Sequence, residues 1–311
     1  MSSTNSLAGR TAVVTGAGAG LGRSEALALA AQGANVVVND VGPAAEEVVA
    51  EIKVLGREAV AVTGDVGEWS MGDRLVRAAV ESFGSLDILV NNAGVLRDKM
   101  LFNLTESDWD DVIRVHLKGH AAVSRAAAAH WRAAAKAAGG PVYGRVVNTS
   151  SEAFLFGAPG QPNYSAAKAG ITALTLATAQ GLSRYGVRAN AICPRARTGM
   201  TAGVFGAGAN ADDGLDILAP ERVGTFVSYL ASPAAAEING QVFVVYGDMV
   251  ALMAAPTVER KFTAGDGAFT PEELDSQLTP YFSGRNPYHN YAAFSVAELD
   301  TTGVENVAAA N

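Results

Sequence analysis

Two hydrophobic periods alternate along most of the chain. Short continuous apolar runs, rich in valine and isoleucine, occur at 11–15, 35–40, 59–63, 86–90, 145–149, 187–192 and 241–246. Such runs are typical of strands that are buried on both faces of a parallel sheet. Alanine-rich segments with helical spacing separate them, at 21–33, 43–56, 68–83, 105–136, 162–185 and 220–232. The alternation predicts an α/β fold, a doubly wound parallel sheet of about seven strands with helices on both faces.

Two segments depart from this alternation. Residues 199–219 are glycine-rich and irregular and follow the sixth predicted strand, so we expect a lid over the functional site there. Residues 251–311 form a long extension that carries several tyrosines and phenylalanines, and we expect it to pack on the same domain or on a neighbouring subunit. No repeat or linker divides the chain, which predicts a single domain over residues 1–250 followed by this extension.

Composition and charge exclude several classes of protein. Hydrophobic residues make up 49% of the 311 residues, which is too many for a disordered chain. The formal net charge of −8 and the absence of a basic block argue against nucleic-acid and membrane partners. The single cysteine excludes an internal disulfide framework and a cysteine-based metal site, and it fits a reducing compartment. Residues 1–9 show no secretory signal, so we expect a cytoplasmic protein without a metal.

A glycine-rich segment follows the first predicted strand and opens the first predicted helix, with glycines at Gly16, Gly18, Gly20 and Gly22. Glycines at this junction let the backbone approach a pyrophosphate, and the N–H groups of the helix start face its negative charge. Alone, such a segment is equally typical of a simple turn. Here the second predicted strand ends in Asp40. A carboxylate there accepts hydrogen bonds from adenosine ribose hydroxyls and repels a 2′-phosphate, which favours NAD over NADP; the alternative is a helix N-cap before Pro43.

Candidate chemistry lies at the start of the predicted helix 162–185. Tyr164 and Lys168 are spaced i, i+4, which puts both on one helix face. A phenol has a pKa of about 10, and a nearby ammonium lowers that pKa, so Tyr164 can exchange a proton with a hydroxyl or carbonyl. Ser151 follows a predicted central strand, at the sheet edge where ligands bind, and can hold the reacting oxygen. The structural alternatives are a helix-surface pair and a turn serine.

These motifs together resemble the short-chain dehydrogenase/reductase family. The glycine-rich loop at 15–22, Asp65-Val66, the segment 91–94, Ser151 and Tyr164-x-x-x-Lys168 match its order and spacing over about residues 8–250. The resemblance implies a Rossmann-type fold in which Tyr164 is the acid or base, Lys168 holds the nicotinamide ribose and Ser151 positions the carbonyl. It implies further NAD contacts from the glycine loop with Leu21 and Gly22, and from Asp65, Val66, Asn91, Ala93, Gly94, Pro194 and Thr198.

Three departures from the family pattern leave questions open. His116 stands where the family usually has an active-site asparagine, and it either takes over a water relay or packs against the backbone. Arg195 replaces the glycine that usually follows Pro194, with Arg197 close behind, and these cations either meet a phosphate or lie in solvent. The extension beyond residue 250 exceeds the usual end of the family.

Within the family, the segments 39–42, 91–99 and 114–119 are similar to the (3R)-hydroxyacyl-CoA dehydrogenase unit of the peroxisomal multifunctional β-oxidation enzyme, which also oxidises 17β-hydroxysteroids. The resemblance implies an NAD-dependent interconversion of a secondary alcohol and a ketone by a homodimer or homotetramer. An acyl-CoA substrate needs cations near the mouth of the site, for which the candidates are Arg97, Lys99, Arg195 and Arg197. A steroid needs an apolar slot. The alternatives are a terpenoid or alicyclic alcohol, an NADPH-dependent 3-ketoacyl reduction, and a non-catalytic NAD-binding regulator.

Overall fold

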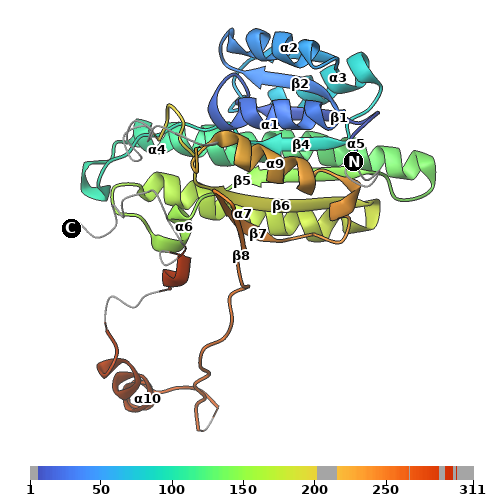
Figure 1. Cartoon of the computed structure of the whole chain (residues 1–311). Coiled ribbons are helices and arrows are strands. Elements are labelled where there is room, and N and C mark those ends of the chain that lie inside the picture. The colour runs from blue at the N-terminus through green and yellow to red at the C-terminus, as the bar shows by residue number, and fades with distance from the viewer. Residues whose placement is uncertain (1–5, 202–215, 266, 287–290, 297–298, 300–311) are drawn as a thin grey trace.

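The middle layer of the molecule is one eight-stranded sheet with helices on both faces (Figure 1). The computed structural model describes residues 6–201, 216–265, 267–286, 291–296 and 299. In sheet order the strands are β3 (Ala59–Thr63), β2 (Asn35–Asp40), β1 (Thr11–Thr15), β4 (Ile88–Asn91), β5 (Gly144–Thr149), β6 (Val187–Pro194), β7 (Val242–Tyr246) and β8 (Met249–Leu252). All neighbours pair in parallel except β8, which is antiparallel to β7. The doubly wound parallel sheet predicted from the sequence is therefore confirmed, and one unpredicted strand extends it.

The helices divide between the two faces of the sheet. One face carries α1 (Gly20–Ala31), α2 (Ala44–Val54) and α9 (Pro220–Leu230), and the other carries α3 (Met71–Phe83), α5 (Gly119–Ala138) and α7 (Pro162–Leu182). The segment 105–136 is not the continuous helix that its spacing predicts. It consists of α4 (Glu106–Val112), the π-helical turn η3 (Ile113–Lys118) and the first part of α5. The short elements are η2 (Leu101–Asn103), α6 (Ala153–Phe156), η4 (Ser183–Tyr185), η5 (Pro233–Ala235) and η6 (Phe294–Val296).

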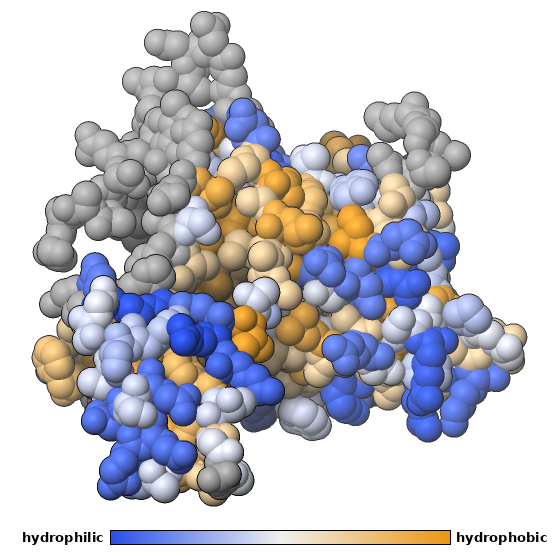
Figure 2. Space-filling model, turned by 90° about the horizontal axis from the view of Figure 1, so that it is seen from below, coloured by the Kyte–Doolittle hydropathy of each residue, from blue (hydrophilic) through white to orange (hydrophobic). Residues whose placement is uncertain are grey.

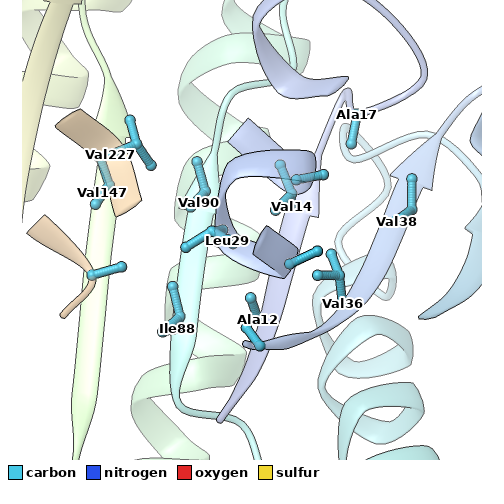
Figure 3. Close-up of a cluster of buried hydrophobic side chains, with 14 of the residues drawn as sticks. Ala12, Val14, Ala17, Leu29, Val36, Val38, Ile88, Val90, Val147 and Val227 are labelled. Atoms are coloured by element: carbon cyan, nitrogen blue, oxygen red, sulfur yellow. The ribbon is translucent and has the colours of Figure 1, made fainter. Parts of the chain in front are cut away.

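The hydrophobic core explains why the strands read as continuous apolar runs. Alternate residues of the central strands, such as Val14 and Val90, point to α1 and α9, where they pack with Leu29 and Val227 (Figure 3). The intervening residues point to the opposite face, where Trp131 of α5 is among the largest buried side chains. Burying a valine or leucine completely contributes about 1.5–3 kcal/mol, so both faces stabilise the sheet. The core thereby fixes the carboxyl ends of neighbouring strands along one edge of the sheet.

The extension begins with a hairpin and then leaves the body. A two-residue turn, Gly247-Asp248, joins β7 to β8. The segment that follows, which includes α10 (Pro271–Ser283) and is called the arm below (residues 254–286), leads away from the sheet, and the chain returns to the sheet at η6 (Figure 1). No residue of α10 is buried. Seen from the side of this arm, hydrophobic residues gather on the body next to the largely hydrophilic arm (Figure 2).

Most of the expected lid, residues 202–215, lies outside the residues that the structure describes. Within the described part of the chain, no helix combines the length and the hydropathy that a membrane span requires.

Candidate active site

The glycine loop between β1 and α1 is packed closely against neighbouring backbone and side chains. Gly16 has a φ of +60°, and a Cβ added to it would lie 2.7 Å from the Cα of Ala93. A Cβ added to Gly18 would lie 2.9 Å from Oδ2 of Asp40. Any larger residue must therefore displace its neighbours. The loop keeps the exposed N–H groups at the start of α1 that suit a phosphate.

Asp40 faces the glycine loop and not the helix that follows it. Its Oδ2 accepts a hydrogen bond from the Gly18 N–H at 2.9 Å, and its Oδ1 accepts one from the Val41 N–H at 2.8 Å. The N-cap of α2 is Pro43, and no side chain caps that helix. The alternative role of Asp40 as the N-cap is therefore wrong. Arg23, the other residue that bears on cofactor choice, donates from Nε to Oε1 of Glu51 at 3.0 Å.

Two asparagines at the end of β4 have different tasks. Asn92 donates from its side chain to the carbonyls of Thr15 and Gly16, both at 3.1 Å, so it fastens the glycine loop to β4. Asn91 is buried and donates to Oδ1 of Asn148 at 2.9 Å, inside the protein. Asn91 thus supports the sheet, and its neighbour Asn92 lines the pocket.

Asp65 and Arg114 form an ion pair at the end of the pocket near β3. Burial opposes ionisation of Asp65, but the hydrogen bond from Arg114 and the Gly67 N–H hold its pKa below the usual value. Both side chains line the pocket. Arg114 was not predicted as a pocket residue from the sequence. Its position two residues before His116 is the sequence feature that could have indicated it, since η3 turns both residues toward the same pocket.

Tyr164 and Lys168 are not a helix-surface pair, because Lys168 is only 2% exposed. The Lys168 ammonium donates to the Thr149 carbonyl at 2.6 Å, and its Nζ lies 5.3 Å from the centroid of the Tyr164 ring. Burial raises the pKa of Tyr164 to about 12, against the lowering effect of the Ser151 hydroxyl. Burial also lowers the pKa of Lys168 to about 7. The pKa of Tyr164 is therefore raised by burial of the phenol, and the expected lowering by the Lys168 ammonium is not seen.

The two serines after β5, Ser150 and Ser151, differ in how many hydrogen bonds their hydroxyls make within the protein. Ser150 is buried, and its hydroxyl donates to the Lys168 carbonyl at 3.0 Å and lies 2.8 Å from Oγ1 of Thr172. Ser151 accepts only a long hydrogen bond, at 3.2 Å, from the Ala153 N–H. Its hydroxyl also lies close enough to Tyr164 to lower the pKa of the phenol. Ser150 lines the pocket and Ser151 lies beside it, but the Ser151 hydroxyl is the one with fewer protein partners and with Tyr164 next to it.

His116 lies between the backbone and Tyr164. Its Nε2 is 3.0 Å from the Val95 nitrogen and 2.8 Å from the Val95 oxygen, so one of these groups is its partner, depending on the tautomer. Its ring meets the Tyr164 ring edge to face, with the centroids 5.3 Å apart. Burial, together with the charge of Lys168, lowers the pKa of His116 to about 3, so the ring is neutral. Its Nδ1 has no hydrogen-bond partner among the described residues.

One pocket of about 470 Å³ brings most of the predicted residues together. It follows the carboxyl ends of β3, β2, β1, β4, β5 and β6, and neighbouring strands lie about 4.8 Å apart, so it spans about 24 Å. That length suits an extended dinucleotide. The predicted residues on its wall are Gly16, Gly20, Leu21, Asp40, Asp65, Val66, Ala93, Gly94, His116, Tyr164, Lys168, Pro194 and Thr198. Gly18, Gly22, Asn91 and Ser151 lie behind or beside this wall, whereas Thr201 belongs to it and was not predicted.

The four cations proposed for an acyl-CoA phosphate are all engaged with carboxylates. The ion pairs are Arg97–Asp111 at 3.3 Å, Lys99–Asp108 at 2.6 Å, Arg195–Glu152 at 2.7 Å and Arg197–Asp216 at 3.0 Å. The alternative that Arg195 and Arg197 lie free in solvent is thus wrong, since both are largely buried and paired, and a phosphate at any of the four cations must compete with a carboxylate. Among the described residues, no group of histidine, cysteine and acidic side chains is arranged to hold a metal ion.

Comparisons with known proteins agree with this geometry. A family model described as short chain dehydrogenase matches residues 10–206. The chain is 56% identical over 298 residues to hydroxyacyl-CoA dehydrogenase ChsB1 of Mycobacterium tuberculosis, which covers 93% of this chain and 94% of that protein. It is 40% identical over 247 residues to peroxisomal multifunctional enzyme type 2 of Mus musculus, covering 76% of this chain and 31% of that enzyme. A solved short chain dehydrogenase from Mycobacterium avium is 43% identical, with a TM-score of 0.80 over 90% of this chain and 97% of that one.

Proposed function

Because this chain belongs to the short-chain dehydrogenase family, we propose that it interconverts a (3R)-hydroxyacyl-CoA and the 3-ketoacyl-CoA with NAD as the cofactor. Membership makes it an oxidoreductase that acts on CH–OH groups of small molecules with a nicotinamide dinucleotide. One observation carries the proposal: Tyr164 and Lys168 stand at one end of a pocket of dinucleotide length, with Ser151 beside them. The similarity to a hydroxyacyl-CoA dehydrogenase over nearly the whole chain supports the substrate class.

We assign the proton transfer to Tyr164. When the substrate is a ketone, the neutral phenol donates its proton to the ketone oxygen, and a pKa of about 12 keeps the phenol neutral until then. When the substrate is an alcohol, the Tyr164 oxygen accepts the hydroxyl proton only after the phenol has given up its own, which at a pKa of about 12 requires that the bound cofactor and substrate favour the phenolate. A protonated Lys168, whose Nζ lies 5.3 Å from the ring centroid, is the nearby charge that stabilises that phenolate. Ser151 holds the substrate oxygen. A bound nicotinamide supplies the hydride acceptor or donor.

NAD is the preferred cofactor in this proposal. The Asp40 carboxylate lines the pocket beside the glycine loop, where it offers an acceptor to ribose hydroxyls and repels a 2′-phosphate. Arg23, the cation that directly follows Gly22 of the glycine loop, already pairs with Glu51. The residues that would hold the pyrophosphate are the loop residues Gly16 and Gly20, and those that would border the adenosine are Asp65 and Val66. The residues that would border the nicotinamide end are Lys168, Pro194 and Thr198.

His116 fits the relay role better than a purely packing role. Its ring borders the pocket, contacts Tyr164 edge to face and stays neutral because the pKa is about 3. Its Nδ1 is buried and has no hydrogen-bond partner among the described residues. In the relay role this nitrogen binds a water molecule that enters with the substrate and passes protons to and from the site. The Val95 backbone holds the other ring nitrogen and thus orients the ring.

A 17β-hydroxysteroid is the second candidate substrate. The observation that favours it is that all four candidate phosphate ligands pair with carboxylates, which an uncharged substrate need not disturb. Leu155 and Phe156 of α6, which follow Ser151 closely in the chain, also have apolar side chains that are only partly buried. The remaining features stay predictions from the sequence: a catalytic domain over 1–250 with a packed extension, a homodimer or homotetramer, and a cytoplasmic location.

The test is an initial-rate panel on the purified protein. The substrates are (3R)- and (3S)-hydroxyacyl-CoA of several chain lengths, a 17β-hydroxysteroid and an alicyclic alcohol, each with NAD and with NADP. We expect NADH to form from the (3R)-hydroxyacyl-CoA series and little turnover of the (3S) series. NADH formation from the steroid alone would move the assignment to the second candidate. A clear preference for NADP would contradict the role of Asp40.

A further inference from the structure

Arg195 joins three distant parts of the chain beside Ser151. Its backbone N–H donates to the Val245 carbonyl at 3.0 Å, which fixes it at the carboxyl ends of β6 and β7. Its guanidinium donates from Nε and from Nη2 to the two carboxylate oxygens of Glu152, both at 2.7 Å. The same Nη2 donates to the Val296 carbonyl at 2.9 Å. One side chain thus holds the sheet, the residue after Ser151 and the returning end of the extension.

The ion pair between Arg195 and Glu152 has the geometry of a strong interaction. The contact is bidentate, and the two side chains are only 15% and 12% exposed. Low exposure weakens screening by solvent, and removing one partner leaves the other charge poorly solvated. Arg195 also lies over the ring of Tyr246, 5.5 Å from its centroid. This arginine is therefore fully engaged and unsuited to receive a phosphate.

The returning end of the extension is buried at this point. Val296 is 2% exposed and packs with Cys193 and Val244 of the sheet and with Phe154, Leu155 and Phe156 of α6. Between β8 and η6 the chain runs through the arm that carries α10, which has no buried residue (Figure 1). The contact at η6 is therefore where the far end of the extension meets the catalytic body.

We propose that the Glu152–Arg195 pair is a latch that fixes the returning extension on α6 and thereby positions Ser151 and the apolar wall of the substrate site. Glu152 is the N-cap residue of α6 and directly follows Ser151, so a shift of this carboxylate moves both. The latch holds an apolar cluster in which Val296 is buried and Leu155 and Phe156 are partly buried. The proposal places the last two against the apolar body of the substrate. An apolar wall selects substrates with a long apolar body. This inference rests on the proposed function for the role of Ser151.

The proposal makes Arg195 and Glu152 positioning residues, and their removal should affect long substrates most. For Arg195→Met we expect kcat/KM for a long-chain (3R)-hydroxyacyl-CoA to fall about tenfold, mainly through KM, because a displaced wall loses apolar contacts. A short-chain (3R)-hydroxyacyl-CoA should change less. Arg195→Lys should recover part of the loss, since it keeps the charge without the bidentate fork. The double variant Glu152→Gln/Arg195→Met should lose less than the sum of the single losses, because it strands no charge.

Hydrogen exchange supplies a readout that needs no substrate. Amides in residues 292–296 should exchange faster in Arg195→Met and in Glu152→Gln than in the wild type, because the anchoring contact to the Val296 carbonyl is weakened. The matched control is Arg125→Met, which breaks the exposed pair with Asp73 at 2.7 Å on α5 and α3 and should change neither readout. Unchanged exchange, or an unchanged KM for the long substrate, overturns the latch. If the wild type oxidises no hydroxyacyl-CoA, the proposed function fails, and the exchange measurement still decides the latch.

Discussion

Asp40→Asn tests the choice of cofactor with little disturbance of the loop. The amide oxygen still accepts from the Gly18 N–H, which now binds Oδ2 at 2.9 Å, but the negative charge is lost and the amide nitrogen leaves the Val41 N–H without its acceptor. Asp40→Ala is less informative, because it leaves the N–H groups of both Gly18 and Val41 without their acceptor. The asparagine variant therefore removes the charge while it keeps the hydrogen bond to the glycine loop.

The expected size follows from the acceptor sites of the carboxylate. A carboxylate offers about four lone-pair sites, and three backbone N–H groups, those of Gly18, Val41 and Gly42, already use three of them. One site on Oδ2 remains for a ribose hydroxyl. A hydrogen bond to a charged group is worth about 1.5–3 kcal/mol and one to a neutral group about 0.5–1.5 kcal/mol, so losing the charge costs about 1–1.5 kcal/mol, which converts to a loss of about 5- to 13-fold in kcat/KM with NAD. Turnover with NADP should rise, because repulsion of the 2′-phosphate disappears.

The assay is the ratio of kcat/KM with NAD to that with NADP, measured on one alcohol for the wild type and for Asp40→Asn. The melting temperature of each protein serves as the structural control. A ratio within about twofold of the wild type, with the melting temperature preserved, refutes the assignment of Asp40 to the ribose. The Asp40 charge would then contribute less than about 0.5 kcal/mol to the preference for NAD.

Substitutions at three further positions probe the pocket and its surroundings. Gly94→Ala places a Cβ 2.2 Å from Cε1 of His116, so we expect a loss of about 1–3 kcal/mol in calorimetry and lower activity; a neutral effect contradicts the packing described. Glu25→Met should raise the free energy of unfolding in urea, because burial raises the Glu25 pKa from 4.5 to about 8 and neither carboxylate oxygen has a partner. The folded state keeps that proton between these two values while the unfolded state releases it, so the gain should be larger at pH 8 than at pH 5, and an equal gain at both contradicts it. His116→Ala should lower kcat about tenfold or more and His116→Asn should retain more activity, whereas equal rates exclude the relay.

The sequence predicts the sheet well because its strands are buried on both faces. That burial requires the continuous apolar runs from which all seven parallel strands were located. The strand β8 and the helix α10 were missed although both have local signals. Gly247-Asp248 is a two-residue turn between two apolar runs, and Thr270 and Glu273 form a capping box before Pro-containing α10.

The site was predicted by residue type and order, but its electrostatics were not. Spacing places Lys168 next to Tyr164, yet it cannot show how deeply the phenol is buried, and burial decides the direction of its pKa. The π-helical turn that aims Arg114 and His116 at the pocket leaves no mark on the hydrophobic period. Carboxylates that neutralise the candidate cations come from other elements of the fold, as Glu152 does for Arg195. Such partners appear only once the chain is folded.

The most direct measurement of the central claim is the turnover of Tyr164→Phe with NAD on the best substrate of the panel. The substitution removes one oxygen and leaves the ring that contacts His116 in place. We predict that kcat falls by about 100- to 10,000-fold, the usual worth of a positioned acid or base, while the dissociation constant for NAD stays within about twofold. Wild-type turnover in this variant would contradict the assignment of the proton transfer to Tyr164.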